Sequence, residues 1–146
     1  MTKDRKIFVG SSTEALAEAA FIANVIEKQT GMEAVGWNRD AFAVGRTHCW
    51  RQSRDFHSII TGAVLLATPD VSCKRDGKWF SAPVANVVFE YGYLAARLTR
   101  ERVAICRFKE AEVPSDRGGM KVIHVKEYLK QNASALPRNA EEALSA

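Results

Sequence analysis

Lys6-Ile7-Phe8-Val9-Gly10-Ser11-Ser12-Thr13-Glu14 is the stretch that decides the fold of this chain. A short apolar run ends at a glycine, and residues 11–14 follow with the spacing of a capping box, the pattern that begins many helices. The stretch therefore predicts a strand over 6–9 that turns directly into a helix. Apolar residues then repeat at helical spacing up to Gly31, a typical helix stop: Leu16, Ala19, Ala20, Ala23 and Ile26.

The same alternation of strand and helix continues along the chain. Further strands are predicted over 33–37, 63–67, 103–106 and 122–125. A second helix is predicted to begin at Thr47, to carry Ile60 on its apolar face and to end at Gly62, and a third is predicted to begin near Ala82. Residues 63–67 are continuously apolar, as in a parallel sheet covered on both faces. We predict an α/β, flavodoxin-like, five-stranded parallel sheet in the order 2-1-3-4-5, with helices on both faces.

The length of 146 residues suits one domain. We expect this domain over 1–130, followed by a C-terminal helix or linker tail over 131–146 that is interrupted by Pro137. Residues 68–83 are polar and basic and predict a long loop.

Composition excludes several classes of protein. No apolar run reaches the roughly 20 residues of a membrane helix, and the polar start of the chain is unlike a signal peptide, so we expect a cytoplasmic protein with no membrane partner. The three cysteines and three histidines lack metal-ligand spacing, and no metal site is expected. The net charge of +4 comes from cations spread along the chain among the acids, which argues against direct nucleic-acid binding.

The third predicted helix is amphipathic. One face should meet the core and holds Val84, Val87, Val88, Tyr91, Leu94, Ala95 and Leu98. The other face should meet solvent and holds Asn86, Phe89, Glu90, Tyr93 and Arg97.

Polar and aromatic residues follow the predicted strands on the side where open α/β sheets bind ligands. In the order 2-1-3, the crevice between strands one and three would bring them together with Glu90: Ser11, Ser12, Trp37, Asn38, Phe42 and Asp70. Arg75 lies in a local group of cations that suits a phosphate contact. Each residue also has a structural interpretation, because serines cap helices, aromatic residues pack in cores and a helical glutamate is ordinarily a solvated charge.

The segment Ala82-Pro83-Val84-Ala85-Asn86-Val87-Val88-Phe89-Glu90-Tyr91-Gly92 resembles the "APRxNVxFElG" signature of bacterial, predicted nucleotide-binding TIR-like (Toll/interleukin-receptor-like) proteins. The sequence departs from the signature at Val84, where the family carries a basic residue. The resemblance extends, in family order, to Lys6–Ser12, Trp37-Asn38 with Phe42 and Gly45, Ala67–Asp70 and Pro114–Asp116.

This resemblance implies a domain that cleaves the nicotinamide–ribose bond of NAD, so that NAD is the substrate and no cofactor is required. It puts the catalytic role on Glu90 and puts Asn86 and the first-loop serines in the substrate pocket. Members of the family are effectors of anti-phage signalling in which a cyclic-nucleotide sensor drives self-assembly through TIR–TIR contacts. We therefore expect self-association and a cyclic-nucleotide-sensing domain or protein as partners.

Two other functions fit the same residues. A nucleoside deoxyribosyltransferase-like enzyme also breaks an N-glycosidic bond on an α/β fold with one glutamate. A TIR scaffold that signals by assembly alone needs no carboxylate. The sequence does not distinguish a linear from a cyclised ADP-ribose product, or a covalent from a non-covalent role for Glu90.

Overall fold

A computed structural model describes residues 5–36, 60–113 and 119–125 of the chain. Its elements are β1 (Lys6–Gly10), η1 (Thr13–Ala15), α1 (Leu16–Thr30), β2 (Glu33–Gly36), β3 (Ile60–Ala67), β4 (Val71–Arg75), β5 (Lys78–Ala82), α3 (Ala85–Leu98), η2 (Arg100–Arg102), β6 (Val103–Arg107) and β7 (Lys121–His124). The second predicted helix, the loop over 114–118 and the tail over 131–146 lie outside the described residues.

The five strands β2-β1-β3-β6-β7 form one parallel sheet in that order. Counted along the chain within this sheet, the order is 2-1-3-4-5, and the prediction is confirmed. β1 lies between β2 and β3, so both of its edges are paired. The end of β1 is therefore the point where the strand order reverses, which is where open α/β sheets bind ligands.

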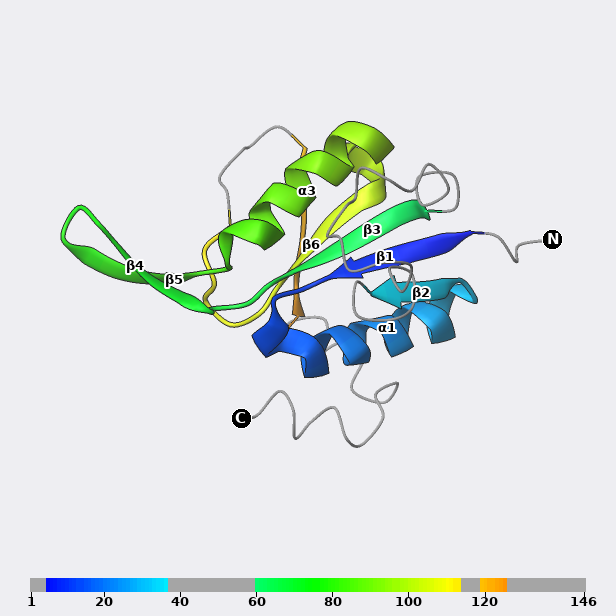
Figure 1. Ribbon diagram of the computed structural model, residues 1–146, viewed down its shortest axis with the longest axis horizontal. Helices are drawn as coiled ribbons and strands as arrows, with labels where there is room; N and C mark the ends of the chain where they lie inside the picture. Colours follow the sequence, from blue (N-terminus) through cyan, green and yellow to red (C-terminus); the bar gives the residue numbers. More distant parts are fainter. Residues whose placement is uncertain (1–4, 37–59, 114–118, 126–146) are drawn as a thin grey trace, which may run out of the picture.

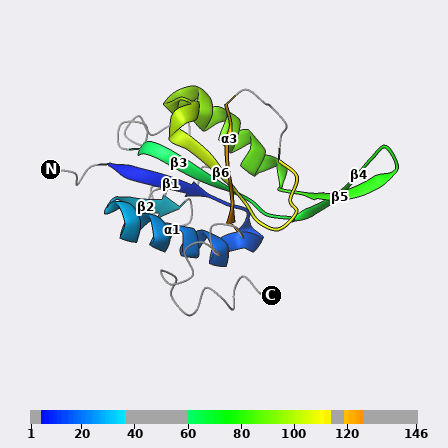
Figure 2. The same ribbon diagram turned by 180° about the vertical axis from the view of Figure 1, so that it is seen from behind.

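The two long helices lie on opposite faces of the sheet (Figures 1 and 2). Alternation along each strand supplies one core to each face, because neighbouring residues of a strand point in opposite directions. Phe8 and Leu65 belong to the core under α3, with Val87, Tyr91 and Leu94 of that helix. Side chains of the opposite parity form the core over α1, which contains Val9, Ala34, Leu66 and Cys106 packed against Ala19, Ile22, Ala23 and Ile26.

The two ends of α1 differ in how their backbone groups are capped. A 3-10 turn over Thr13–Ala15 precedes the α-helix, and Ser12, which comes before this turn, makes no side-chain cap hydrogen bond. The hydroxyl of Ser11 donates instead to the carbonyl of Ser12 at 3.0 Å. The predicted stop is confirmed, since Gly31 adopts a left-handed conformation at φ 69° and its N–H donates to the Glu27 carbonyl.

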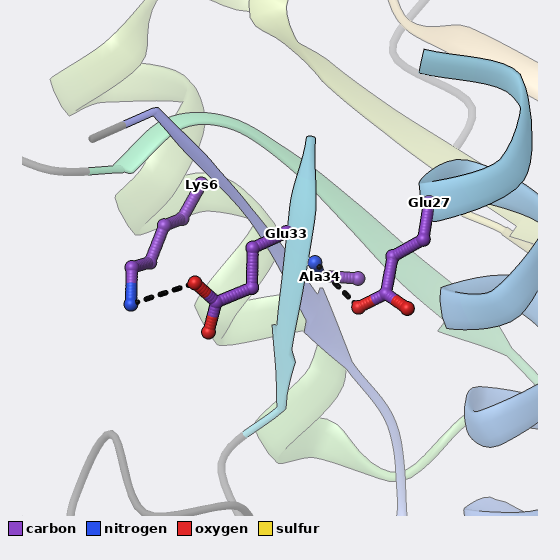
Figure 3. A network of polar contacts seen from close by, with 4 residues as sticks. All are labelled: Lys6, Glu27, Glu33 and Ala34. Carbon is purple, nitrogen blue, oxygen red and sulfur yellow. Dashed lines mark hydrogen bonds and ion pairs between the residues drawn. The ribbon is translucent and has the colours of Figure 1, made fainter. Parts of the chain in front are cut away.

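Polar contacts join β1, α1 and β2 at the start of β2 (Figure 3). The Glu27 carboxylate accepts a hydrogen bond from the backbone N–H of Ala34 at 3.1 Å, which ties α1 to β2. Lys6 and Glu33 form an ion pair at 3.0 Å across the paired strands β1 and β2. Both contacts lie at the start of β2, away from the carboxyl ends of the strands.

β3 begins earlier than predicted. Ile60 and Gly62 were assigned to the second helix, but both are residues of the strand and pair with β1. Gly62 is therefore a strand residue and not a helix stop. A Cβ at this position would lie 3.1 Å from Ile7 Cδ1 and 3.2 Å from the carbonyl oxygen of Arg102. The close approach of neighbouring chain segments explains this glycine.

The predicted loop over 68–83 is instead a β-hairpin of β4 and β5, which extends away from the sheet (Figure 1). Asp76 and Gly77 both have positive φ, at 52° and 77°, as a tight two-residue hairpin turn requires. The Asp-Gly pair was the available sequence signal. The base of the hairpin is tied down by the N–H of Asp70, which donates to the carbonyl of Ala82.

None of the helices in the described part of the chain is both long and apolar enough to span a bilayer.

The two-core arrangement predicts a large effect of Leu66→Ala. The side chain is 0% exposed in the core over α1, so its removal should lower the free energy of unfolding by about 2–5 kcal/mol. Leu16, which is 38% exposed on α1, is the matched control, and Leu16→Ala should cost less than about 0.5 kcal/mol. Urea unfolding followed by circular dichroism measures both, and equal losses would contradict the arrangement.

Candidate functional site

α3 begins just after the hairpin, with Val84 in an extended conformation before its first turn. Val87, Tyr91 and Leu94 are buried against the sheet as predicted. Two residues differ from the predicted faces: Val88 is exposed, and Tyr93 packs partly against the core. The buried face is thus rotated from the one predicted, towards the side of the helix that carries Glu90.

This rotation turns Glu90 towards the sheet, so that its side chain is half-buried and not fully exposed to solvent as predicted. Its Oε2 atom is buried, and it lies 3.0 Å from the position that a Cβ on Gly10 would occupy. Gly10 has the same parity as Phe8 along β1 and pairs with Leu65 of β3, so all three lie on the α3 face. The carboxylate therefore lies over the last residue of β1, at the topological switch point.

Two buried side-chain polar atoms lack a hydrogen-bond partner among the described residues, and both belong to this place. One is Glu90 Oε2, and the other is the hydroxyl of Ser12, two residues after Gly10. Buried polar groups are nearly always paired in native proteins, because desolvation without a partner costs about 1–3 kcal/mol each. These two atoms make the end of β1 the candidate functional site.

Burial also changes the acidity of the site. It raises the pKa of Glu90 from 4.5 to about 7, because the charged form loses hydration among apolar neighbours such as Leu65. At neutral pH the carboxyl is thus divided between its two protonation states, as is common for groups that handle protons or charge in active sites.

Asp70 and Asn86 lie near this edge in different settings. Asp70 follows β3, and its carboxylate accepts a 2.6 Å hydrogen bond from the buried Thr68 hydroxyl. Asn86 is exposed in the first turn of α3, one turn before Glu90. The structure thus brings Glu90 to Gly10, two residues before Ser12, and leaves Asp70 engaged with its own turn.

Arg75 lies near the tip of the hairpin. Its guanidinium donates to Glu112 Oε1 at 2.6 Å and lies 4.8 Å from the centre of the Phe80 ring. These contacts fix the hairpin to the segment after β6, which also donates from the Glu112 N–H to the Ser81 carbonyl at 2.7 Å. The other predicted site residues, Trp37, Asn38 and Phe42, lie outside the described residues.

Gly10 was not among the predicted site residues. Its φ is not positive, so the backbone does not require glycine for its conformation. A glycine at the end of a buried strand is itself a signal of close approach by another group, but the sequence does not say which group approaches.

Residues 6–127 match the family model described as "CAP12/Pycsar effector protein, TIR domain". The chain belongs to this family. Its fold is accordingly that of a TIR domain, and the matched residues include the whole described sheet and α3.

Relatives of this TIR domain carry names of the same kind. It is 28% identical over 140 residues to CD-NTase-associated protein 12 of Flavobacterium daejeonense, an alignment that covers 96% of this chain and 44% of the relative. It is 30% identical over 120 residues to Pycsar effector protein BcPycTIR of Burkholderia cepacia, covering 81% of this chain and 39% of the relative. The chain thus spans less than half the length of these relatives.

The buried carboxylate predicts a pH-dependent cost in stability. Because the folded state of this TIR domain binds the Glu90 proton more tightly than the unfolded state, stability falls as pH rises from about 4.5 to about 7. Glu90→Gln should remove this dependence, so that the variant gains on the wild type by on the order of 1 kcal/mol between pH 4.5 and pH 8, after discounting for the solvent that still reaches the group.

Thermal and urea unfolding give the free energy of unfolding of both proteins at each pH. The measured quantity is how the difference between Glu90→Gln and the wild type changes with pH. Comparing differences removes the pH-independent effect of burying an amide. Glu33→Gln is the control, because it removes a half-exposed carboxylate at the start of β2, away from the carboxyl ends of the strands. Its difference in free energy of unfolding from the wild type should change by less than about 0.5 kcal/mol over the same pH range. A Glu90→Gln curve parallel to that of the wild type would refute the burial of a titrating carboxyl.

Proposed function

We propose that this TIR domain is an NAD glycohydrolase, which cleaves the nicotinamide–ribose bond to give nicotinamide and ADP-ribose, with Glu90 as the catalytic carboxylate. The observation that carries the proposal is the buried Oε2 of Glu90 next to Gly10, with the buried hydroxyl of Ser12 two residues further along the chain; neither atom has a hydrogen-bond partner among the described residues. Membership of the CAP12/Pycsar effector family supports it.

The chemistry needs few groups. Nicotinamide leaves a cationic pyridinium as a neutral pyridine, so its nitrogen requires no proton. As the bond breaks, positive charge moves onto the ribose, and an ionised carboxylate in a poorly solvated place stabilises that charge more strongly than it would in water. Glu90 meets this requirement when ionised, because Oε2 is buried and accepts no hydrogen bond within the described residues.

Ser12 would complete the substrate site. Its hydroxyl can donate to or accept from a ribose hydroxyl or a phosphate oxygen. It also immediately precedes the first helical turn, Thr13–Ala15, where backbone N–H groups without helical partners favour anions. Ser11 is buried at the same turn. We propose that the other predicted site residues also contact the substrate, together with the two serines. These residues are Trp37, Asn38, Phe42, Asp70, Arg75 and Asn86.

The burial of Glu90 also bears on the two rival functions. A scaffold that signals by assembly has no use for a carboxyl group whose ionisation is penalised, and surface positions on α3 would carry a glutamate at no cost. A nucleoside deoxyribosyltransferase-like enzyme would use the same carboxylate on a free deoxynucleoside. Only its substrate separates it from the NAD proposal.

Glu90→Gln tests the catalytic assignment. The amide keeps the shape but has no negative charge for the forming cation, so nicotinamide release from NAD should fall by about a hundredfold or more. Glu33→Gln is the matched control at the opposite edge and should keep wild-type turnover. The kcat/KM of the wild type should rise with pH through about 7, because the ionised form of Glu90 is required.

Chromatographic detection of nicotinamide, ADP-ribose and free bases, with NAD and deoxynucleosides offered side by side, reads out all three functions. Base release from deoxynucleosides with NAD left intact would favour the transferase. Turnover of NAD by Glu90→Gln at the wild-type rate would remove Glu90 from the mechanism.

We further propose that the domain acts in anti-phage defence, as an effector that self-associates and is controlled by a cyclic-nucleotide-sensing domain or protein. The relatives' printed names, "CD-NTase-associated protein" and "Pycsar effector protein", support this setting. α3 exposes Val88 and Phe89 beside Glu90, with Phe89 71% exposed, which suits a contact with another copy. A TIR domain over 1–130 followed by a tail over 131–146 stays a prediction.

Self-association predicts that specific activity rises steeply with protein concentration, because a neighbour would shift a sparsely populated competent state towards dominance. Nicotinamide release should be followed over a hundredfold range of concentration, with sedimentation velocity on the same samples. Phe89→Ser should flatten the dependence, whereas Leu16→Ser on the opposite face of the sheet should not. A specific activity that stays constant while the protein remains monomeric would contradict the coupling.

A further inference from the structure

Gly10 has no conformational reason to be glycine. Its φ lies outside the positive region that the described glycines at 31, 77 and 119 occupy. An L-residue could therefore adopt the same backbone, and the reason for glycine must be the space that a side chain would fill.

That space is already occupied. A Cβ at Gly10 would overlap Leu65 Cδ1 and would lie 3.0 Å from both Phe8 Cε1 and Glu90 Oε2. Leu65 and Phe8 are fully buried core residues, whereas Glu90 is the end of a flexible side chain from α3. A side chain at position 10 would therefore overlap Leu65 and would also push the carboxylate away by a few tenths of an ångström or more.

Other glycines make the contrast clear. Around Gly62 the neighbours are the Ile7 side chain and a backbone carbonyl, which are structural groups. Around Gly92, an exposed residue of α3, nothing lies within 4 Å of the Cβ position. At Gly10 the neighbours are two core side chains and the carboxylate that is proposed to react.

We propose that Gly10 is a positioning residue for Glu90: the missing side chain leaves the space in which the carboxylate lies against the end of β1. This inference rests on the proposed function for its kinetic consequence, but not for its structural one. A misplacement of about 1 Å in a reacting group can lower turnover by about a hundredfold.

The direction of the displacement follows from the surroundings. Phe8 and Leu65 are fully buried, and protein cores are close-packed, so we expect the carboxylate to move outward, towards water. Rehydration would then lower its pKa from about 7 towards the ordinary value of 4.5. Substrate binding that depends on other groups would change much less than turnover.

The experiment uses Leu65→Val as the background, because valine lacks the δ-methyl group that overlaps the new Cβ and so lets residue 10 be changed without destroying the core. Gly10→Ala, Leu65→Val and the double variant are compared with the wild type. Carbon-13 NMR of glutamate-labelled protein follows the Glu90 carboxyl titration, which is assigned by its absence in Glu90→Gln. Nicotinamide release gives kcat and KM for NAD.

In the double variant, relative to Leu65→Val, the Glu90 pKa should fall towards 4.5 and kcat should drop about tenfold or more, with KM changed less than about threefold. A merely structural role for Gly10 would lower the melting temperature without moving the titration. An unchanged titration and kcat in a folded double variant would overturn the proposal.

The two proposals fail in different ways. If wild-type protein releases no nicotinamide, NAD hydrolysis is wrong, and the NMR titration still decides whether Gly10 places the carboxylate. If Gly10→Ala alone does not fold, the double variant carries the comparison.

Discussion

The Glu90 carboxylate lies beside Gly10, next to the space that a side chain there would need, and this is the constraint around which this end of the molecule is arranged. A helix side chain can reach the backbone of a central strand only where that strand has no side chain of its own, and β1 supplies this gap at its last residue. The cost is a buried oxygen that has no hydrogen-bond partner in the described part of the chain. Such local instability is typical of sites that are optimised for a ligand rather than for stability.

The pleat of the sheet decides which residues take part. Phe8 and Leu65 face α3, while their neighbours Val9 and Leu66 face α1, so a shift of one residue in β1 would exchange the two cores. Gly10 shares the parity of Phe8 and so faces α3, whereas Ser12 comes after the strand has ended and begins the turn into α1. The same alternation that builds two cores therefore sets the carboxylate and the serine hydroxyl at one strand end.

Much of this fold could be predicted from local sequence patterns, because each of these features depends on residues that are close together in the sequence. The strand over Lys6–Gly10, the left-handed Gly31 and the doubly buried β3 follow from periodicity and turn chemistry. The Asp-Gly pair at the tip of the hairpin is typical of a tight turn, but the polar composition of the segment led to the prediction of a loop. The burial of Glu90 could not be predicted, since it depends on how α3 is rotated on the sheet, and an ideal 100° per residue placed Val88 inside and Glu90 outside.

The absence of a described cationic partner for Glu90 Oε2 bears on why one carboxylate could suffice. An arginine or lysine beside it would lower its pKa and keep it ionised, but would also neutralise the field that a forming ribosyl cation needs. Burial does the reverse: it leaves the charge unscreened and makes ionisation costly until a positive group arrives. A substrate that brings a cationic pyridinium, and passes its charge to the adjacent ribose, would favour the ionised carboxylate at the moment when it is required.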